Sequence, residues 1–460
     1  MPFDKLATMT GGRLQTTEHS HRSFTGVSTD SRAVEAGQLF FAIKGEKNDG
    51  HRFIDQAIAR GAAGVVVEEG FFVDRALPAH NAVIEVADTH AAMLQLAGEY
   101  LRTLPAKRLG ITGSNGKTTT KEFTFRLLSA VEDDIYRSPG NFNNLFGIPL
   151  ALFAMPTNTR LAILEMGISV PGEMDRLASL VRPHLMAVTN VGPTHLEFLG
   201  TVEAVAQEKL RAMRYCEPGA PLVVNADDPV LLAEAGRVHD RPTTFAVHNY
   251  ADFRADLIRQ SDTGAIVTIE RHNFHLPLFG QYQVYNLLTA YAIARVMGMS
   301  FDGIETETIE LSTGSMRGEL IESRGIKFIS DCYNANPESV RAGLESFARL
   351  PHAGRKIVVL GDMLELGESS EKYHREIGRL LAEDTFDLVL AVGPMSRHTI
   401  KSAQAAGARR ERLHYFSDAR DCAEAAPTII KPGDLVYLKG SRGIGLEAVL
   451  KAFVMDKGEA

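Results

Sequence analysis

Short apolar runs, separated by polar or glycine-rich turns, recur through the middle of the chain. They fall at Leu109–Thr112, Leu161–Leu164, Leu185–Thr189 and Leu222–Val224. Continuous apolar runs of this length, bounded by turn residues, are typical of strands that are buried on both faces. Because longer stretches suited to helices lie between them, the pattern predicts a mainly parallel sheet with helices on both faces.

The two ends of the chain show the same alternation. Near the N-terminus, apolar runs at Gln38–Ile43 and Gly64–Val67 flank a helix expected at Phe53–Arg60. Beyond a turn-rich stretch at residues 310–318, strands are expected at 328–329, 357–360, 388–392 and 435–438. Alternating positions at 252–279 favour antiparallel strands. We therefore predict an α/β protein with three domains, at residues 1–85, 86–312 and 313–460.

Composition excludes several classes of protein. Hydrophobic residues make up 45% of the chain and charged residues 23%, which is ordinary for a globular protein. The net charge of -8, with no basic block, argues against a nucleic-acid partner. The cysteines are far apart and are expected to be reduced thiols; they are Cys216, Cys332 and Cys422. Since no signal segment or membrane-spanning run is visible, we expect a cytoplasmic protein that does not insert into membranes.

A glycine-bearing turn follows the first central strand and leads into a stretch expected to be helical to about Ala130. Its residues are Gly113, Ser114, Asn115, Gly116, Lys117, Thr118 and Thr119. Glycines let backbone N–H groups approach anionic oxygens, and the helix start directs its positive end at them. Lys117 could reach terminal phosphates and Thr118 could hold Mg²⁺, so the turn predicts a triphosphate site. A plain strand–turn–helix corner is the alternative.

Two polar residues are expected at the same sheet edge, and a third lies on a helix nearby in the sequence. Glu165 ends the strand 161–164, where a carboxylate beside a phosphate loop is a natural Mg²⁺ ligand. His195 follows another strand of this sheet and should face the same crevice, although a structural role is equally open. Lys209 lies on a helix expected at Val202–Tyr215, where charged side chains usually face solvent.

Other polar stretches leave two interpretations open. The loop that begins at Asp331 carries Asn334 and Asn336, and it suits either a substrate contact or a helix N-cap, or both. Arg317 could reach a phosphate from the third domain, or it could be a solvated linker residue. The cluster Val27–Arg32 could bind a ligand, but a capped loop is the simpler reading.

Taken together, these stretches resemble the Mur ligases, the ATP-dependent amide-bond enzymes of peptidoglycan precursor synthesis. The resemblance runs the length of the chain and rests on residues 111–121, 140–149, 165–167, 190–197 and 225–228. Within the family, Tyr-Asn-Ala-Asn-Pro-Glu-Ser at 333–339 and the stretch 360–368 resemble members that add D-alanyl-D-alanine. The implied fold is a central phosphate-loop ATPase domain, flanked by a small N-terminal UDP-binding domain and a C-terminal Rossmann-like domain.

The resemblance implies roles for individual residues. Thr118 and Glu165 match the ligands of one Mg²⁺, while His195 and a carbamylated Lys209 match those of a second; with Lys117 they form the catalytic set. The implied nucleotide contacts are the loop residues 113–119, Asn286, Arg317 and Asp331. The implied contacts with the UDP-sugar substrate and the incoming dipeptide are Thr29, Ser31, Lys47, Asn48, Asn141, Asn143, Asn144, Asn334 and Asn336.

The resemblance also implies a reaction. A carboxylate of UDP-MurNAc-tripeptide would attack ATP to give an acyl phosphate, and D-Ala-D-Ala would then displace phosphate, in a protein expected to act as a monomer. Two alternatives remain open from the sequence. One is a Mur ligase that adds a single amino acid, and the other is a nucleotide-binding regulatory protein on the same scaffold.

Overall fold

The computed structural model describes residues 1–45, 48–72, 80–261, 264–312, 314, 316–383 and 385–454. The chain forms two compact units. The first comprises residues 1–110, 134–166 and 175–184, and the second comprises residues 111–133, 167–174 and 185–460. Both units combine helices with mostly parallel sheets, so the predicted α/β class is confirmed.

The N-terminal part of the first unit is a five-stranded sheet with the order β1-β5-β4-β3-β2. Residues Leu39 and Phe41 of β3 pack with α1 and α3, while Phe40 between them packs with α2 on the other face. This alternation explains the unbroken apolar run in the sequence. The elements are α1 (Phe3–Thr10), β1 (Arg13–Leu14), β2 (Val27–Ser28), β3 (Leu39–Phe41), α2 (Ile54–Ala59), β4 (Gly64–Glu68), β5 (Ala82–Val86) and α3 (Thr89–Arg102).

A seven-stranded sheet has the order β12-β11-β10-β9-β6-β8-β7. Strand β6 (Lys107–Thr112) is divided between the units after Gly110. In the first unit, β7 (Ile135–Arg137) pairs parallel with β8 (Leu161–Glu165). In the second, four parallel strands follow one another: β9 (Leu185–Val188), β10 (Leu222–Asn225), β11 (Thr243–Ala246) and β12 (Phe253–Arg254). The predicted central parallel sheet is therefore confirmed.

Helices between these strands fall where the sequence predicts them. The helix expected at 202–215 ends earlier than predicted, at Leu210, and continues as a 3-10 turn over Arg211–Arg214. The others are α4 (Lys117–Ser129), α5 (Gly147–Phe153), α6 (Glu173–Val181), α7 (Leu196–Leu199), α8 (Val202–Leu210), α9 (Pro229–Val238) and α10 (Tyr282–Val296). The antiparallel strands expected at 252–279 are confirmed as β13 (Leu257–Ser261), β14 (Gly264–Ile269) and β15 (His272–Leu276).

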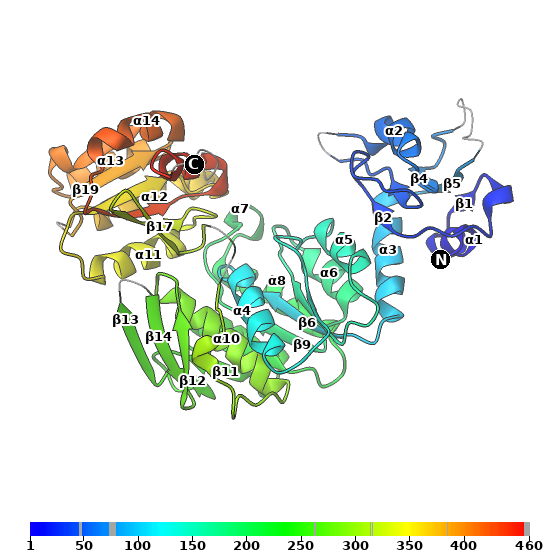
Figure 1. Ribbon diagram of the computed structural model, residues 1–460, viewed down its shortest axis with the longest axis horizontal. Helices are drawn as coiled ribbons and strands as arrows, with labels where there is room; N and C mark the ends of the chain where they lie inside the picture. The colour runs from blue at the N-terminus through cyan, green and yellow to red at the C-terminus, as the bar shows by residue number, and fades with distance from the viewer. Residues whose placement is uncertain are drawn as a thin grey trace. The chain divides into compact units, whose positions relative to one another are not determined.

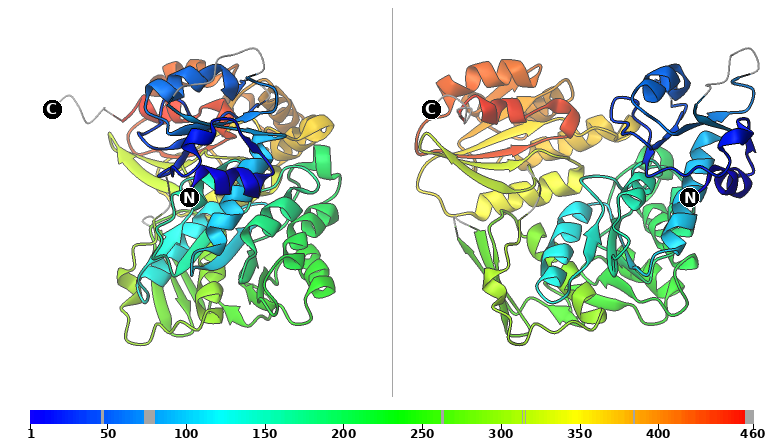
Figure 2. Two further views of the ribbon diagram at one scale, coloured as in Figure 1. Left: turned by 90° about the vertical axis from the view of Figure 1, so that its right-hand side faces the viewer. Right: turned by 45° about the vertical axis from the view of Figure 1, so that its right-hand side comes forward.

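The last sheet has six strands in the order β16-β17-β21-β18-β19-β20 (Figures 1 and 2). In β18, Val358 and Leu360 pack with α11, α12 and α13, while Ile357 and Val359 pack with α14 and α15 on the opposite face. The strands are β16 (Glu319–Ser323), β17 (Ile326–Asp331), β18 (Lys356–Gly361), β19 (Leu388–Val392), β20 (Leu413–Phe416) and β21 (Leu435–Lys439). The helices are α11 (Pro337–Arg349), α12 (Ser370–Leu380), α13 (Ser396–Ala405), α14 (Ala419–Ile429) and α15 (Glu447–Lys451).

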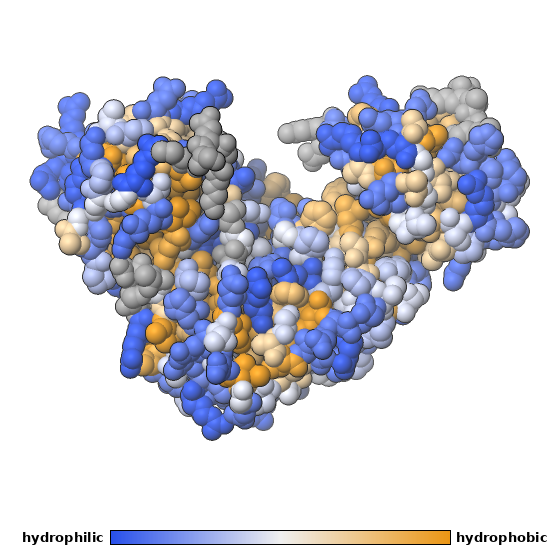
Figure 3. All heavy atoms as spheres, viewed as in Figure 1, coloured by the Kyte–Doolittle hydropathy of each residue, from blue (hydrophilic) through white to orange (hydrophobic). Residues whose placement is uncertain are grey.

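The surface of each unit mixes hydrophilic and hydrophobic residues, as Figure 3 shows for one face. On the three-stranded sheet, Leu257 and Ile266 are exposed. No helix in the described ranges is long and apolar enough to cross a membrane. The three cysteines are free thiols, two of them buried.

Candidate functional site

The glycine-bearing turn joins β6 to α4, as predicted. Gly113 and Gly116 have φ angles of 152° and 78°, and Gly116 is the N-cap of α4. A Cβ on Gly113 would lie 1.9 Å from Thr189 Oγ1, and one on Gly116 would lie 2.1 Å from Asn286 Oδ1. Both positions therefore require glycine, which keeps the backbone N–H groups accessible beside the start of a helix.

Lys117 folds back over this turn. Its Nζ donates hydrogen bonds to Gly113 O at 2.7 Å and to Ser114 O at 3.4 Å. The ammonium group is thus held at the turn and does not extend into solvent. At the turn it can neutralise the charge of phosphate oxygens. Thr118 and Thr119 are buried in the first turn of α4, and Ser114 Oγ accepts a hydrogen bond from Gly192 N at 3.0 Å.

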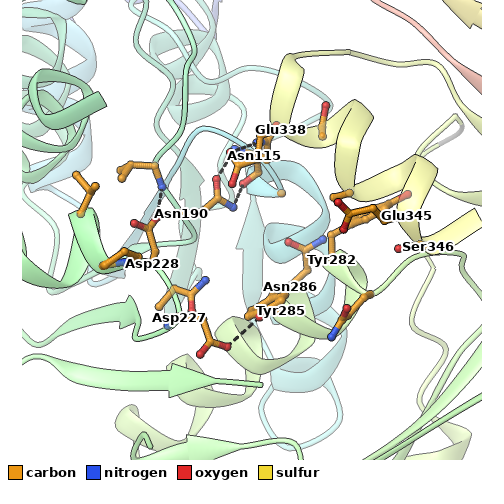
Figure 4. A pocket seen from close by; sticks show the side chains of 18 of the residues that line it. Asn115, Asn190, Asp227, Asp228, Tyr282, Tyr285, Asn286, Glu338, Glu345 and Ser346 are labelled. Atoms are coloured by element: carbon orange, nitrogen blue, oxygen red, sulfur yellow. Dashed lines mark hydrogen bonds between the residues drawn. The ribbon is translucent and has the colours of Figure 1, made fainter. Parts of the chain in front are cut away.

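A cavity of about 460 Å³ opens next to the turn within the second unit (Figure 4). Asn115 and Gly116 form one wall, and the other lining residues come from the ends of β9 and β10, from α9, α10 and α11, and from the end of β21 at Lys439. This volume lies in the range of small-molecule sites. The polar side chains that line it include Asn190, Asp227, Asp228, Tyr282, Tyr285, Asn286, Glu338, Glu345, Arg349 and Lys439.

The acidic residues of this cavity have distinct environments. Asp227 is partly buried, but backbone N–H groups of His248, Asn249 and Val247 outweigh that burial and lower the pKa of its carboxyl. Burial raises the pKa of Asp228, although its carboxylate accepts hydrogen bonds from Leu231 N and Val191 N. The Asp227 carboxylate also accepts from the Tyr285 hydroxyl at 2.8 Å, which fixes Tyr285 of α10 against the turn that follows β10 at the cavity wall.

Glu338 is the most perturbed carboxyl of the cavity. The residue as a whole is exposed, but its carboxylate end is enclosed by protein: Oε2 lies 3.3 Å from Asn115 Nδ2, and a Cβ on Gly192 would lie 2.0 Å from the same oxygen. This enclosure, together with the Asp228 charge, raises the pKa of Glu338 to about 7.

Asn286 lines the cavity from α10, as expected of a nucleotide contact. Its side chain is buried; Oδ1 accepts a hydrogen bond from Thr120 Oγ1 at 3.3 Å, and Nδ2 donates to Gln283 Oε1 at 3.0 Å. Neither of these two hydrogen-bond partners of Asn286 could be predicted from the sequence. Together they fix the amide against the phosphate turn.

Lys209 is buried instead of solvated, contrary to the usual behaviour of charged helix residues. Only 1% of its surface is exposed, and burial, with Lys117 nearby, lowers the pKa of its amine well below the ordinary value. Burial and the charges of Lys209 and Lys117 also lower the pKa of His195 to about 4. His195 Nδ1 lies 3.4 Å from Glu365 Oε2. Both residues therefore share one electrostatic environment in the second unit.

Glu165 is the last residue of β8 in the first unit and is almost completely buried. Its Oε1 accepts a hydrogen bond from Asn143 Nδ2 at 2.8 Å. Asn144 has a structural task, because its Oδ1 accepts from Phe146 N and Gly147 N at the start of α5. Asn141 is exposed. Within the described residues, no three His, Cys, Asp or Glu side chains form a set that could hold a metal ion.

Three predicted site residues, Arg317, Asp331 and Asn334, lie in or next to the C-terminal sheet, and the sequence did not indicate their contacts. Asp331 is the last residue of β17 instead of a loop residue, and its Oδ2 accepts hydrogen bonds from Tyr282, Tyr437 and Lys439. Arg317 stacks over the Tyr333 ring, with its guanidinium carbon 3.7 Å from the ring centroid. Asn334 is exposed.

Asn336 has the N-cap role that was one of the two interpretations of its loop. It is the N-cap of α11, where its Oδ1 accepts from Ser339 N at 2.9 Å. Its Nδ2 also donates to Asn115 Oδ1 of the phosphate turn at 2.7 Å.

The predicted UDP-sugar contacts of the first unit are only partly described. Ser31 is buried and donates to Gln56 Oε1 at 2.6 Å, Thr29 is half-buried, and Asn48 is exposed. Lys47 lies outside the described residues. Asp30 lies between Thr29 and Ser31 in the sequence. Hydrogen bonds from Arg32 lower the pKa of its carboxyl to about 2, and these bonds hold the loop in place.

Sequence reasoning missed several cavity residues, above all Asp227, Tyr282, Glu338 and Lys439. They come from separate elements and share no spacing. The one available signal was position, because Asp227 and Lys439 lie at the carboxyl ends of parallel strands, where ligands bind in such sheets.

Comparison with known proteins identifies the class to which this site belongs. Three family models match the chain: "Mur ligase family, catalytic domain" at residues 23–101, "Mur ligase middle domain" at 111–294, and "Mur ligase, glutamate ligase domain" at 316–442. The chain belongs to the Mur ligase family.

One curated relative and two solved structures show which members of this family the chain resembles. A UDP-N-acetylmuramoyl-tripeptide–D-alanyl-D-alanine ligase of Bacillus subtilis is 35% identical over 98% of this chain and 97% of its own length. The crystal structure of MurF from Acinetobacter baumannii has a TM-score of 0.86 and 29% identity, with 98% of each chain covered. MurF ligase from Thermotoga maritima, solved in complex with ADP, has a TM-score of 0.81 and 29% identity over 93% of this chain and 96% of its own.

Proposed function

We propose that this protein joins D-alanyl-D-alanine to UDP-N-acetylmuramoyl-tripeptide at the expense of ATP, giving the pentapeptide precursor of peptidoglycan, ADP and phosphate. The observation that supports it most directly is the glycine-closed turn with Lys117 folded over it, beside a cavity large enough for a nucleoside. The substrate choice rests on similarity to D-alanyl-D-alanine ligases over 98% of the chain.

The chemistry needs a phosphorylated intermediate, because hydroxide is a poor leaving group from a carboxylate. The terminal carboxylate oxygen of the tripeptide attacks the γ-phosphorus of ATP, and the bond to the β-phosphate oxygen breaks to release ADP. The amine of D-Ala-D-Ala then attacks the acyl carbon of the acyl phosphate, loses a proton, and expels inorganic phosphate. Lys117 and the N–H groups at the start of α4 stabilise the charge on the transferred group.

The adenosine part of ATP fits the cavity beside the turn. Asn286 offers a fixed amide for the base, and Asp331 and Arg317 are assigned to nucleotide contacts from the C-terminal sheet side. Tyr282 links the two regions, because its hydroxyl on α10 binds Asp331.

The donor chemistry suits one Mg²⁺ directly. The Thr118 hydroxyl and the buried Glu165 carboxylate are oxygen donors, the kind that Mg²⁺ prefers. When bound, such an ion would polarise the phosphates and neutralise their charge. These assignments follow the family resemblance.

A second Mg²⁺ requires a change in Lys209. An unmodified, charged lysine beside His195 would repel a cation; burial is the largest cause of the low pKa of His195, and the charge of Lys209 adds to it. Because burial favours the neutral Lys209 amine, that amine is suited to react with carbon dioxide, and the resulting carbamate would replace a positive group by an oxygen ligand. The carbamate and neutral His195 are then an acceptable donor set.

The remaining assignments concern the substrates and the domains. Thr29, Ser31, Lys47 and Asn48, with Asn141, Asn143 and Asn144, are assigned to the UDP-sugar substrate, while Asn334 and Asn336 are assigned to the dipeptide. Three domains, at 1–85, 86–312 and 313–460, would then each handle one substrate, in a protein that acts as a monomer. The product would supply cell-wall synthesis during growth and division.

The amine substrate can be tested by offering D-Ala-D-Ala, D-Ala, D-Glu, L-Lys or meso-diaminopimelate with ATP, Mg²⁺ and UDP-MurNAc-tripeptide, and weighing the product. We expect a product heavier by the dipeptide less one water and no product with the single amino acids. A product with a single amino acid instead would assign the chain to another activity of the family.

A further inference from the structure

Asn115 occupies an unusual place in the phosphate turn, because its backbone N–H, its carbonyl and both polar atoms of its side chain all form hydrogen bonds. Its N–H donates to Asn190 Oδ1 at 2.9 Å, and its carbonyl accepts from Thr189 Oγ1 at 2.6 Å and from Asn190 Nδ2 at 3.2 Å. The end of β9 thus holds its peptide groups. Its side chain is left to contact a different part of the unit.

The Asn115 side chain is held by the start of α11, more than two hundred residues away in sequence. Its Oδ1 accepts from Asn336 Nδ2 at 2.7 Å. Its Nδ2 donates to Glu338 Oε2 at 3.3 Å, and Figure 4 shows these two side chains next to each other. We call these three residues the Asn115 clasp. One carboxamide supplies both an acceptor and a donor, which neither aspartate nor an apolar residue can do.

Both partners of Asn115 are fixed before they reach it. Asn336 is buried, and its Oδ1 is committed to capping α11, so its Nδ2 has a set direction. Glu338 Oε2 occupies a space that exists only because residue 192 is glycine, since a Cβ there would lie 2.0 Å away. The clasp is therefore a preformed contact surface, not a chance meeting of mobile side chains.

The clasp acts on the part of the turn that must receive phosphate. Asn115 lies directly before Gly116, the N-cap of α4, and between the Gly113 carbonyl and the Lys117 ammonium that binds it. Rotation of the Asn115 peptide would redirect the adjacent N–H groups. Asn336 follows two residues after Asn334, in the loop assigned to the dipeptide.

We propose that Asn336 and Glu338 are positioning residues for phosphoryl transfer, which hold the phosphate turn in its anion-binding form through the Asn115 side chain. The inference rests on the proposed function for its link to the dipeptide, and on the geometry of the second unit for its link to the nucleotide. It makes binding of ATP and of the amine substrate reciprocally coupled, because both depend on the same contact.

A double-mutant cycle tests the clasp. Asn336→Ser keeps an N-cap oxygen for α11 but removes the amide donor, Asn115→Ala removes the side chain that is held, and Glu338→Ala removes the second partner. The full-length variants would be titrated with a non-hydrolysable ATP analogue and Mg²⁺ by calorimetry. Arg341→Gln, at an exposed position of the same helix, is the control.

We expect Asn115→Ala and Asn336→Ser each to weaken analogue binding about tenfold, as the loss of a hydrogen bond of about 1.4 kcal/mol implies. The double variant should bind no more weakly than the weaker single variant. In the ligation assay, kcat should fall while KM for UDP-MurNAc-tripeptide stays unchanged, and Arg341→Gln should match the parent protein.

Unchanged analogue affinity in all three variants would overturn the proposal, as would effects that simply add in the double variant. Lowered unfolding temperature with unchanged affinity would also overturn it, because the clasp would then only stabilise the fold. If Asn336→Ser does not fold, Glu338→Ala gives the same test from the other partner. A parent protein that binds the analogue but does not ligate D-Ala-D-Ala would contradict the proposed function and leave this titration decisive for the clasp.

Discussion

At the scale of single residues, two lysines have environments that differ from those of ordinary lysines on a protein surface. Lys117 lies against the carbonyls of its own turn, and Lys209 is almost completely buried. Each arrangement holds a positive or nucleophilic nitrogen ready for a negatively charged or electrophilic partner. The sequence identifies Lys117 by its neighbours but gives no physical reason to single out Lys209, because burial is a property of the fold.

Replacing Lys117 by alanine should remove turnover. The group stabilises charge on the transferred phosphoryl group, and the loss of one such donor lowers kcat by at least about 10²–10³-fold. The unfolding temperature should stay near that of the parent protein, because the hydrogen bonds from Lys117 Nζ to Gly113 O and Ser114 O are local to the turn, and its positive charge lies near that of the buried Lys209. Lys451→Ala, at an exposed position of α15, is the control. An unchanged kcat would contradict the assignment of the turn.

Carbamylation of Lys209 predicts a spectroscopic signal and a chemical rescue. Protein equilibrated with ¹³C-bicarbonate should show a carbamate carbon resonance that Lys209→Ala lacks. The same variant should be inactive and should recover part of its activity in acetate or propionate, which can supply the missing carboxylate to the cation. The absence of both the resonance and the rescue would show that Lys209 acts as an unmodified amine.

Glu338 predicts a pH dependence of stability. Enclosure and the charge of Asp228 raise the pKa of Glu338 in the folded protein to about 7. Between the ordinary carboxyl pKa and pH 7, the folded state therefore keeps on Glu338 a proton that the unfolded chain has lost. Its stabilising contribution is complete below the ordinary carboxyl pKa and is lost as pH rises through about 7. Glu338→Gln should therefore match the parent in unfolding temperature at pH 5 and exceed it at pH 8. The exposed Glu203→Gln should show no such divergence.

At the scale of elements, the phosphate turn requires glycine at position 116 for two reasons. The backbone there has a positive φ, and there is no space for a Cβ. Gly116 and Gly298 both have positive φ, near 80°, but a Cβ on Gly298 would meet nothing within 4 Å, whereas one on Gly116 would strike Asn286. The two helix-end glycines thus separate backbone strain from steric conflict.

Alanine at these two glycines should give different results. Gly298→Ala should cost about 1 kcal/mol of unfolding free energy, the usual penalty for a left-handed conformation, and leave ATP affinity unchanged. Gly116→Ala should cost more and should also weaken ATP binding, because the residue must shift away from Asn286 Oδ1. Denaturant unfolding and analogue titration measure the two effects. Equal losses of stability, with unchanged affinity for Gly116→Ala, would contradict this account of the turn.

The strands that could be predicted are those buried on both faces. Those at 161–165, 185–188 and 388–392 read as unbroken apolar runs, and each was found within one or two residues. Strands such as β7 and β16 were missed because they are only half-buried and carry polar or charged residues. The site divides in the same way: the phosphate turn, with Asn115, has a local signature, whereas Asp227, Tyr282 and Glu338 come together at the cavity only through the fold.

At the scale of the whole molecule, sequence similarity extends along nearly the entire chain, so the fold and the family are settled together. The B. subtilis relative and the A. baumannii structure each align with 98% of it. Within the second unit, the clasp joins the phosphate turn to the start of α11, and the Tyr282–Asp331 contact joins α10 to the C-terminal sheet. Such contacts predict that the chemistry on ATP depends on the state of the C-terminal part.

The most direct test of the proposed ligase is phosphate release from ATP at constant UDP-MurNAc-tripeptide, with D-Ala-D-Ala present or absent. We predict release that requires the dipeptide and equals, mole for mole, the pentapeptide product formed. Release at the same rate without the dipeptide, or no release with all three substrates present, would contradict the account.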